Sequence, residues 1–196
     1  MATYSAPTAD VSDSASIGDG TKIWHLAQVR EGAKIGAGCV VGRGAYVDHG
    51  VHMGNNCKIQ NHALVYAPAQ LGVGVFVGPA AVFANDMFPR AVSPDLTLKG
   101  VDDWNPEGTV VGDGASIGAR AVLVPGLTIG AWAMIAAGAV VTRNVPAHAL
   151  MVGVPARQAG WVGKSGKRCE QIGDIWVDPD TEQKFEEVDG ELQELS

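Results

Sequence analysis

The feature that most constrains this chain is a six-residue repeat of aliphatic side chains. A Val, Ile, Leu or Met stands at every sixth position from Val11 to Val77, Phe83 ends this run, and the same pattern resumes from Val111 to Val141. Four residues after each of them, a small or compact side chain forms a second column. A period of six residues fits neither the 3.6 residues per turn of an α-helix nor the alternation of apolar and polar residues in a half-buried strand. The repeat unit is therefore a short strand followed by a turn.

The register of the repeat predicts how these units stack. Three units make a triangular coil of 18 residues, and coils stacked about 4.8 Å apart let each strand pair with the strand above it. Glycines such as Gly18, Gly36 and Gly118 directly follow the aliphatic residue. We expect them at the bends, where the backbone needs permissive angles. The sequence thus predicts an all-β prism with an aliphatic core, in which residues 18 positions apart share one side.

The hexads resemble those of the hexapeptide-repeat acyltransferases. This resemblance covers roughly residues 9 to 160 and implies a left-handed parallel β-helix that forms a homotrimer with active sites between neighbouring prisms. We expect an acetyltransferase domain over residues 1–160 and a C-terminal capping extension over residues 161–196, with a hairpin near residues 173–186 and then an acidic tail. Only Cys169 lies in this extension, so a zinc site is not expected there.

The repeat is interrupted between Phe83 and Val111. The segment is rich in Pro, Asp and Gly, which predicts an excursion loop at about residues 86–109. Long loops without periodicity in a compact domain are usually functional or disordered, and we expect a functional one here. A tolerated surface insertion is the alternative.

Charge and composition exclude several classes of partner. The net charge of -7 disfavours binding to nucleic acid. No apolar run approaches the roughly 18 residues of a membrane helix. The three cysteines form no CxxC pair, and no leader-like segment begins the chain. These features favour a soluble protein of the reducing cytoplasm.

Two columns of outward polar residues are candidates for substrate binding. The first column and its flank contain Trp24, His25, Arg43 and Asn61. The second contains Arg30, Glu31, Asp48, His49, Tyr66, Ala67 and Asn85. An arginine, Arg30 or Arg43, can neutralise a diphosphate in a bidentate manner. Outward aromatic rings such as Trp24 and Tyr66 line an interface or stack on a base. We therefore predict substrate contacts from Trp24, His25, Arg30, Arg43, Asn61 and Tyr66, with a solvated surface as the alternative.

The string VGPAAVFANDMFP resembles the catalytic coil of hexapeptide sugar acetyltransferases. In relatives that acetylate hydroxyl groups, a histidine base stands just before the closing proline, where this chain has Phe88. A neutral amine attacks a thioester without such a base, so the change favours an amine acceptor. Two further strings, WHLAQVREGAKIG and NDMFPRA, extend the resemblance. With them, the chain is similar to the 3-N-acetyltransferases that act on UDP-linked 2-acetamido-3-amino-2,3-dideoxyglucuronic acid. Those enzymes serve the synthesis of bacterial surface polysaccharide. That resemblance implies catalytic roles for Asn85 and, second to it, Asp86. Asp86 can instead cap the start of the loop.

The resemblance also implies acetyl-CoA as cosubstrate. The coenzyme is expected along the C-terminal coils, with its pantetheine amides at the backbone of Ala119 and Ala137 and a phosphate at Arg157. The stretch VGVPAR, which contains Arg157, is similar to the closing segment of these acyltransferases. No metal is expected.

Three other functions remain open from the sequence. A sugar O-acetyltransferase is disfavoured by Phe88. A metal hydratase of the γ-carbonic anhydrase type would need His49, His52 and His62 as ligands, but their positions in the repeat do not predict convergence. A non-catalytic β-helical scaffold is the third.

Overall fold

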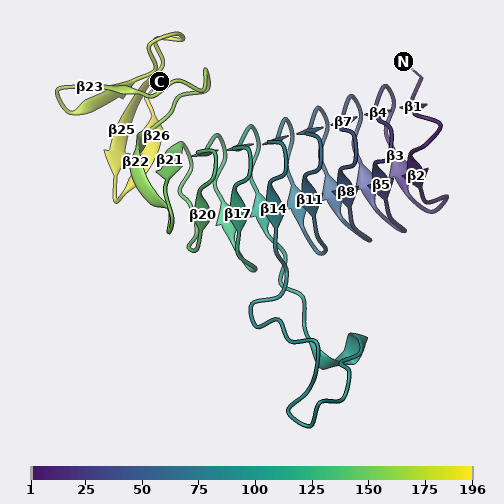
Figure 1. Ribbon diagram of the computed structural model, residues 1–196. Helices are drawn as coiled ribbons and strands as arrows, with labels where there is room; N and C mark the ends of the chain where they lie inside the picture. The colour runs from purple at the N-terminus through teal and green to yellow at the C-terminus, as the bar shows by residue number, and fades with distance from the viewer. Residues whose placement is uncertain (1, 196) are drawn as a thin grey trace.

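Residues 2–195 are described by the computed structural model. Three parallel sheets form the sides of an elongated prism (Figure 1), which is a left-handed parallel β-helix. Most strands are two residues long and pair with the strand of the next coil. The partner usually lies 18 positions away, as in Tyr4↔Lys22 and Lys22↔Val40, and 40 positions away across the long loop, as in Phe76↔Ser116. The fold class expected from the hexads is confirmed.

The strands of each sheet follow one another along the prism. Sheet A comprises β1 (Tyr4–Ser5), β4 (Lys22–Ile23), β7 (Val40–Val41), β10 (Lys58–Ile59), β13 (Phe76–Val77), β16 (Ser116–Ile117), β19 (Met134–Ile135), β21 (Ala149–Val152) and β22 (Arg157–Trp161). Sheet B comprises β2 (Asp10–Val11), β5 (Gln28–Val29), β8 (Tyr46–Val47), β11 (Leu64–Val65), β14 (Val82–Phe83), β17 (Val122–Leu123) and β20 (Val140–Val141). Sheet C comprises β3 (Ser16–Ile17), β6 (Lys34–Ile35), β9 (His52–Met53), β12 (Gln70–Leu71), β15 (Val110–Val111) and β18 (Thr128–Ile129).

The two inward columns predicted from the hexads form the core. Ile59 and Val65 from the first column and Ala63 and Ala69 from the second are completely buried. Burial of a Val or Ile side chain stabilises a fold by about 1.5–3 kcal/mol. Because every coil contributes both columns, the stabilisation is spread evenly along the prism.

The glycines that follow the aliphatic residues have a different role from the one predicted. The left-handed φ angles fall three positions after the aliphatic residue, as at Gly38 with φ 69°. At Gly118 a Cβ atom would lie closer than 3.0 Å to the backbone nitrogen of Ala137 in the next coil, which is too close for any side chain. The expectation that these glycines provide permissive bend angles was wrong. They are required because adjacent coils approach closely at the edges.

Three edges join the sheets, and each is a column of turns. We name them by the sheets they join. The A–B edge consists of residues 6–9, 24–27, 42–45, 60–63, 78–81, 118–121 and 136–139. The B–C edge consists of residues 12–15, 30–33, 48–51, 66–69 and 124–127, and the long loop after β14 leaves from it. The C–A edge consists of residues 18–21, 36–39, 54–57, 72–75, 112–115 and 130–133.

The segment between β14 and β15 extends away from the prism (Figure 1). It contains an antiparallel bridge between Val92 and Leu98 and one short 3-10 helix, η1 (Val101–Asp103). Large apolar side chains are unusually exposed on it, with Phe88 at 83% and Val101 at 85%. The prism continues undisturbed on the far side, because β15 pairs in register with β12.

The C-terminal residues fold as a four-stranded antiparallel sheet at the end of the prism. Its strands are β23 (Glu170–Ile172), β24 (Ile175–Val177), β25 (Lys184–Val188) and β26 (Glu191–Glu194). The antiparallel pairing of β24 with β25 agrees with the hairpin expected near residues 173–186. The acidic tail is not free, because it forms β26. Phe185 packs on His148 of the last coil, with ring centroids 4.9 Å apart, and joins this sheet to the prism.

Asp178 organises the C-terminal sheet through a buried carboxylate. It is completely buried and accepts hydrogen bonds from the N–H and hydroxyl of Ser165, at 3.0 and 2.6 Å, and from the N–H of Asp180 at 3.0 Å. Burial alone raises the pKa of Asp178, but these hydrogen bonds outweigh it and hold the pKa well below its ordinary value of 3.8.

Replacing Asp178 with asparagine should lower the thermal unfolding midpoint by about 5–10 °C, because an amide cannot accept all of these bonds. Asp180→Asn removes only an exposed ion pair to Lys167 and should shift the midpoint by less than about 2 °C. A carboxyl with a lowered pKa stabilises the fold above its ordinary pKa and loses that contribution as the pH falls towards the folded value. The difference in thermal unfolding midpoint between the wild type and Asp178→Asn should therefore become smaller below pH 3.8. An equal effect of the two substitutions would contradict this role.

No helix within residues 2–195 is long and apolar enough to cross a membrane.

Candidate functional site

The predicted site residues lie on two different edges of the prism. Asn85 and Tyr66 lie on the B–C edge, together with Arg30. The A–B edge carries the remaining substrate and coenzyme candidates, apart from Asp86 in the loop and Arg157 in β22. They are Trp24, His25, Arg43, Asn61, Ala119 and Ala137. Both columns anticipated from the 18-residue register are present, but sheet B separates them within one protomer.

A hydrogen-bond network runs along the B–C edge and centres on the Asp48 carboxylate, whose side chain is 7% exposed. Asp48 Oδ1 accepts from the Tyr46 hydroxyl at 2.8 Å, from Arg30 Nη1 at 3.3 Å and from the backbone N–H of His49 at 2.8 Å. His49 Nδ1 lies 3.0 Å from the same oxygen. Asp48 Oδ2 accepts from the N–H of Ala67 at 3.1 Å. One carboxylate therefore connects three successive coils of the prism.

The electrostatics of this network keep Asp48 ionised. Burial by itself raises the pKa of Asp48, but the hydrogen bonds from Ala67, Tyr46 and His49 more than offset it, so the pKa lies below its ordinary value. Burial and the hydrogen bond to Asp48 raise the pKa of the Tyr46 phenol, although the bond from Arg30 acts the other way. At neutral pH the phenol therefore donates to a carboxylate.

The guanidinium of Arg30, which the sequence predicted to contact the substrate, already has hydrogen-bond partners within the protein. Its Nε donates to Glu31 Oε2 at 3.0 Å, and its Nη1 faces both Asp48 and the Tyr46 hydroxyl at 3.3 Å. A guanidinium already shared between two carboxylates is a weaker partner for a diphosphate than a free one. The prediction that Arg30 contacts substrate stays a prediction.

The side-chain amide of Asn85 has a defined orientation. Its Nδ2 donates to the carbonyl oxygen of Ala67 at 2.7 Å. Because a carbonyl only accepts, the nitrogen of the amide must face Ala67. The backbone carbonyl of Asn85 accepts from the N–H of Glu107 at 3.0 Å, which closes the neck of the loop. Within residues 2–195 no hydrogen bond reaches Oδ1 of Asn85, so this atom is an available acceptor.

The other two residues singled out in the catalytic string begin the loop. Asp86 Oδ1 accepts from the N–H of Phe88 at 2.9 Å, which is the loop-capping bond that the sequence left as the alternative. Phe88 itself projects into solvent. No acid or base replaces the histidine at that position.

The A–B edge shows a looser arrangement. Asn61 Oδ1 accepts from the backbone N–H of Arg43 at 2.9 Å, and His25 Nδ1 lies 2.9 Å from the hydroxyl of Thr8. The Trp24 ring, 42% exposed, contacts the edge of Tyr4 at 5.7 Å between centroids. Arg43 has no ion-pair partner among residues 2–195. Arg43 and Trp24 are thus accessible for a ligand or for a second protomer.

Two of the three coenzyme candidates, Ala119 and Ala137, lie near an apolar hollow of about 340 Å³ towards the C-terminal end of sheet A. It is lined by Phe76, Ser116, Ile117, Gly118, Met134, Ile135, Ala136, Ala137 and Leu150. Ala137 therefore lies at its rim, and Ala119 is in the turn one coil earlier. Arg157 is exposed in β22, donates to the carbonyl of Ala156 at 2.9 Å, and is not among the residues that line this hollow.

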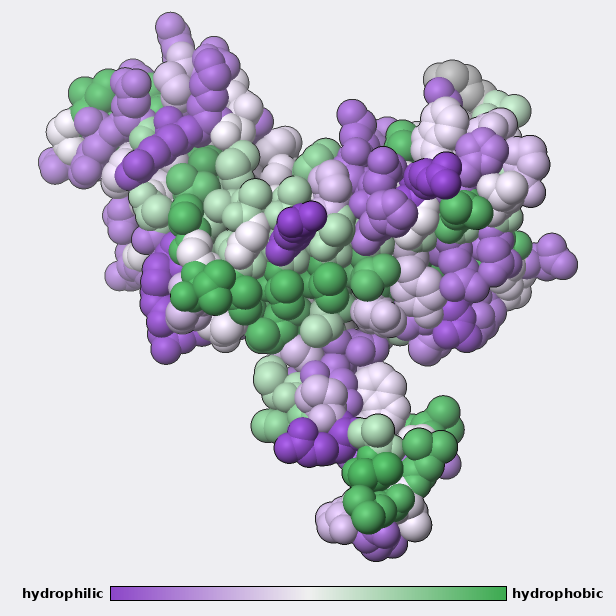
Figure 2. Space-filling model, viewed as in Figure 1, coloured by the Kyte–Doolittle hydropathy of each residue, from purple (hydrophilic) through white to green (hydrophobic). Residues whose placement is uncertain are grey.

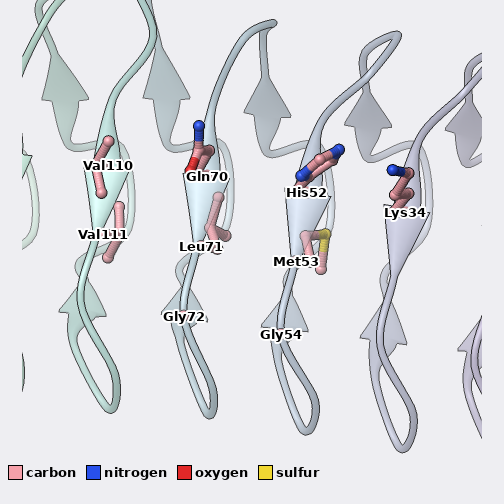
Figure 3. A pocket seen from close by; sticks show the side chains of 9 residues that line it. All are labelled: Lys34, His52, Met53, Gly54, Gln70, Leu71, Gly72, Val110 and Val111. Atoms are coloured by element: carbon pink, nitrogen blue, oxygen red, sulfur yellow. The ribbon is translucent and has the colours of Figure 1, made fainter.

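A second hollow, of about 400 Å³, lies on sheet C (Figure 3). Lys34, His52, Gln70 and Val110 lie side by side across it, one from each coil. It contains none of the predicted site residues. The three histidines of the metal-hydratase alternative are dispersed, since His52 lies on sheet C, His49 on the B–C edge and His62 on the A–B edge. Among residues 2–195 no group of three metal-ligating side chains is assembled.

The outer face of sheet B is apolar over its C-terminal half. Leu64, Val82, Val122 and Val140 occupy successive outward positions and are only half-buried. Figure 2 shows the resulting hydrophobic band along the prism, above the loop. A continuous apolar stripe of this kind is typical of an interaction surface.

Asp48, whose carboxylate is the centre of the network, was not predicted to contact the substrate or to take part in catalysis, and neither was Tyr46. Asp48 follows an inward aliphatic residue at the position where many coils have glycine, and a charge there is unusual. Its burial depends on contacts from Arg30, 18 positions earlier, and from Ala67, 19 positions later. The register identifies such neighbours, but it does not reveal which side chain turns inward.

Sequence comparisons identify the repeats. The chain matches the family described as "Bacterial transferase hexapeptide (six repeats)" over residues 14–49 and 108–143, and "Hexapeptide repeat of succinyl-transferase" over residues 32–67. It is 56% identical over 54 residues to dTDP-3-amino-3,6-dideoxy-alpha-D-galactopyranose 3-N-acetyltransferase of Aneurinibacillus thermoaerophilus, covering 28% of each protein. It is 37% identical over 92 residues to serine acetyltransferase 4 of Arabidopsis thaliana, covering 46% of this chain and 25% of that protein. The aligned parts span about a quarter of these relatives.

Among solved structures, the chain is similar to a mutant of AntD, an N-acyltransferase from Bacillus cereus, in complex with dTDP and coenzyme A. The TM-score is 0.55 at 18% identity, covering 81% of this chain and 83% of that one. This likeness concerns the fold. Together with the stacked hexads, these matches show a left-handed parallel β-helix that carries repeats similar to those of the bacterial transferase hexapeptide family over residues 14–49 and 108–143.

Proposed function

We propose that this protein is an acetyl-CoA-dependent N-acetyltransferase that acts on an amino sugar carried by a nucleotide. The observation that carries the proposal is the Asn85 amide, which is fixed at the neck of the loop with Oδ1 available as an acceptor. An acceptor at this point can orient an N–H of a sugar amine. The relative from Aneurinibacillus, named as an amino-sugar N-acetyltransferase, supports this acceptor class.

The reaction needs little acid–base chemistry from the protein. The neutral amine attacks the thioester carbonyl carbon, a C–N bond forms, and the C–S bond breaks as CoA leaves. The surplus proton of the amine passes to the departing sulfur or to water. Asn85 Oδ1 accepts one N–H of the amine, which aims the nitrogen lone pair at the thioester. Phe88, where relatives that acetylate hydroxyls have a base, is consistent with this route.

The geometry favours a site built from two protomers. Asn85 lies on the B–C edge, whereas Ala119 and Ala137 lie on the A–B edge, so one protomer does not bring both to the same place. We propose a homotrimer in which the apolar stripe on sheet B contributes to the contact between copies. Asn85 of one protomer then faces the coenzyme held near Ala137 of the next.

The acceptor that we propose is the 3-amino group of UDP-linked 2-acetamido-3-amino-2,3-dideoxyglucuronic acid, a precursor of bacterial surface polysaccharide. Trp24, His25, Arg43, Asn61 and Tyr66 are the proposed sugar and nucleotide contacts, with Arg157 at a coenzyme phosphate. The guanidinium of Arg43, which forms no ion pair within residues 2–195, suits a diphosphate better than the engaged Arg30.

A thiol-release assay with acetyl-CoA tests this function. Purified protein is mixed with UDP-amino sugars that carry or lack a 6-carboxylate, and the product is examined by mass spectrometry. We expect release with the 3-amino-uronic acid at least about tenfold faster than with its counterpart without the carboxylate, since a carboxylate adds a charge-assisted contact. Preference for the neutral sugar would reassign the acceptor, and an ester product would indicate an O-acetyltransferase. Absence of release with every sugar would contradict the proposal.

A further inference from the structure

The Asp48 carboxylate makes more contacts than a turn of this prism requires. At the C–A edge, one acceptor atom per turn is sufficient: Asn55 Oδ1 accepts from the N–H of Ala37 at 2.8 Å, and Asp113 Oδ1 accepts from the N–H of Val73 at 2.7 Å. Those side chains are exposed and each uses one oxygen. Asp48 is buried and uses both oxygens, with four donor atoms on Oδ1 and the Ala67 N–H alone on Oδ2.

The separate contact of Oδ2 leads to the candidate catalytic residue. Ala67 donates its N–H to Asp48 at 3.1 Å, and its carbonyl oxygen accepts from Asn85 Nδ2 at 2.7 Å. Both contacts fix the same residue of the intervening turn. From this geometry we propose that Asp48 is a positioning residue, which holds Ala67 so that the Asn85 amide presents Oδ1 to the acceptor amine. The inference rests on the function proposed for Asn85.

The network requires a carboxylate at position 48. An asparagine would keep one oxygen and replace the other by an NH2 group, which only donates. With the oxygen towards Tyr46 and His49, the amide nitrogen would face the Ala67 N–H, donor against donor. With the oxygen towards Ala67, the amide nitrogen would face the four donors on the other side. Because the donors at Oδ1 are more numerous, the first orientation is favoured, and Ala67 moves.

The test is a double-mutant cycle with Asp48→Asn and Asn85→Ala, measured with acetyl-CoA and the best acceptor from the UDP-amino-sugar panel. Asp113→Asn is the matched control, because it is the same substitution at the C–A edge and its single contact survives in an amide. A residue that acts through Asn85 loses its effect once Asn85 is gone. A residue that only stabilises the prism would act equally in both backgrounds.

We expect Asp48→Asn to lower kcat by about 10- to 100-fold with the KM for acetyl-CoA nearly unchanged, since a displacement of about 1 Å has costs of this order. In the Asn85→Ala background the same substitution should change kcat by less than about twofold. Asp113→Asn should leave kcat unchanged. Equal effects of Asp48→Asn in both backgrounds, or wild-type kcat for Asp48→Asn, would overturn the inference.

A crystal structure of Asp48→Asn provides a readout that is independent of activity. The distance from Asn85 Nδ2 to the carbonyl oxygen of Ala67 should exceed hydrogen-bonding range, and persistence of this bond near 2.7 Å would refute the positioning role. If Asn85→Ala alone retains wild-type kcat, the proposed role of Asn85 fails, and the crystal structure still decides whether Asp48 holds its amide.

Discussion

Replacing Asn85 with alanine is expected to lower the rate of acetyl transfer by one to three orders of magnitude. The alanine has no Oδ1 to accept the N–H of the amine, so the nucleophile loses its orientation towards the thioester. It also loses the bond from Nδ2 to the carbonyl of Ala67, but that bond lies at a half-exposed edge and contributes little to the stability of the prism. The measurement is kcat/KM from thiol release, with thermal unfolding as a check on the fold.

Asn55→Ala is the matched control for this substitution. Asn55 also stacks on the preceding coil through its amide, with Oδ1 accepting from the N–H of Ala37, but it lies on the C–A edge with no predicted site residue. Its rate should stay within about twofold of wild type, as is usual for sites remote from the chemistry. Wild-type turnover by Asn85→Ala, or an equal loss in Asn55→Ala, would remove Asn85 from the mechanism.

Gly118→Ala should destabilise the prism by about 3 kcal/mol or more, at the upper end of the cost of overpacking. The added methyl group would overlap the backbone nitrogen of Ala137 and lie 2.6 Å from the carbonyl oxygen of Ile135. These are main-chain atoms of the next coil and cannot rotate aside, so two coils must separate and lose packing along both neighbouring sheets. Chemical denaturation of the purified variant measures the free energy of unfolding.

Gly50→Ala is the control that separates the steric cost of a methyl group between coils from the cost of the backbone conformation. Gly50 has a left-handed φ of 62°, and nothing lies within 4 Å of a Cβ placed there. Only the conformational cost of a left-handed alanine remains, about 1 kcal/mol. A cost at Gly50 equal to that at Gly118 would show that the approach of adjacent coils does not decide where glycine is needed.

The six-residue spacing was enough to predict most of the prism. It identified the inward residues, such as Ile59 and Ala63, and it grouped the outward residues into columns, because a coil of three equal units leaves no choice of register. It also located the loop, since the loss of period between Phe83 and Val111 is visible without a structure.

Other features depend on distances that the sequence does not contain. The role of Gly118 follows from how closely two coils approach, and not from its own backbone angles. The importance of Asp48 depends on which way a carboxylate turns at an edge, which follows from five donor atoms contributed by four different residues. The C-terminal sheet has no repeat, so the pairing of β26 with β25 could not be predicted from periodicity.

The way in which β15 resumes the prism makes the length of the loop independent of the scaffold. The three strand pairs that span the loop, Gln70↔Val110, Phe76↔Ser116 and Val82↔Val122, are forty positions apart, whereas pairs such as His52↔Gln70 are eighteen apart. The 22 additional residues therefore leave and re-enter at one corner without shifting any strand. Lengthening or shortening this excursion changes neither the number of coils nor their alignment. The loop can therefore change in length and sequence while the framework that holds Asn85 stays the same.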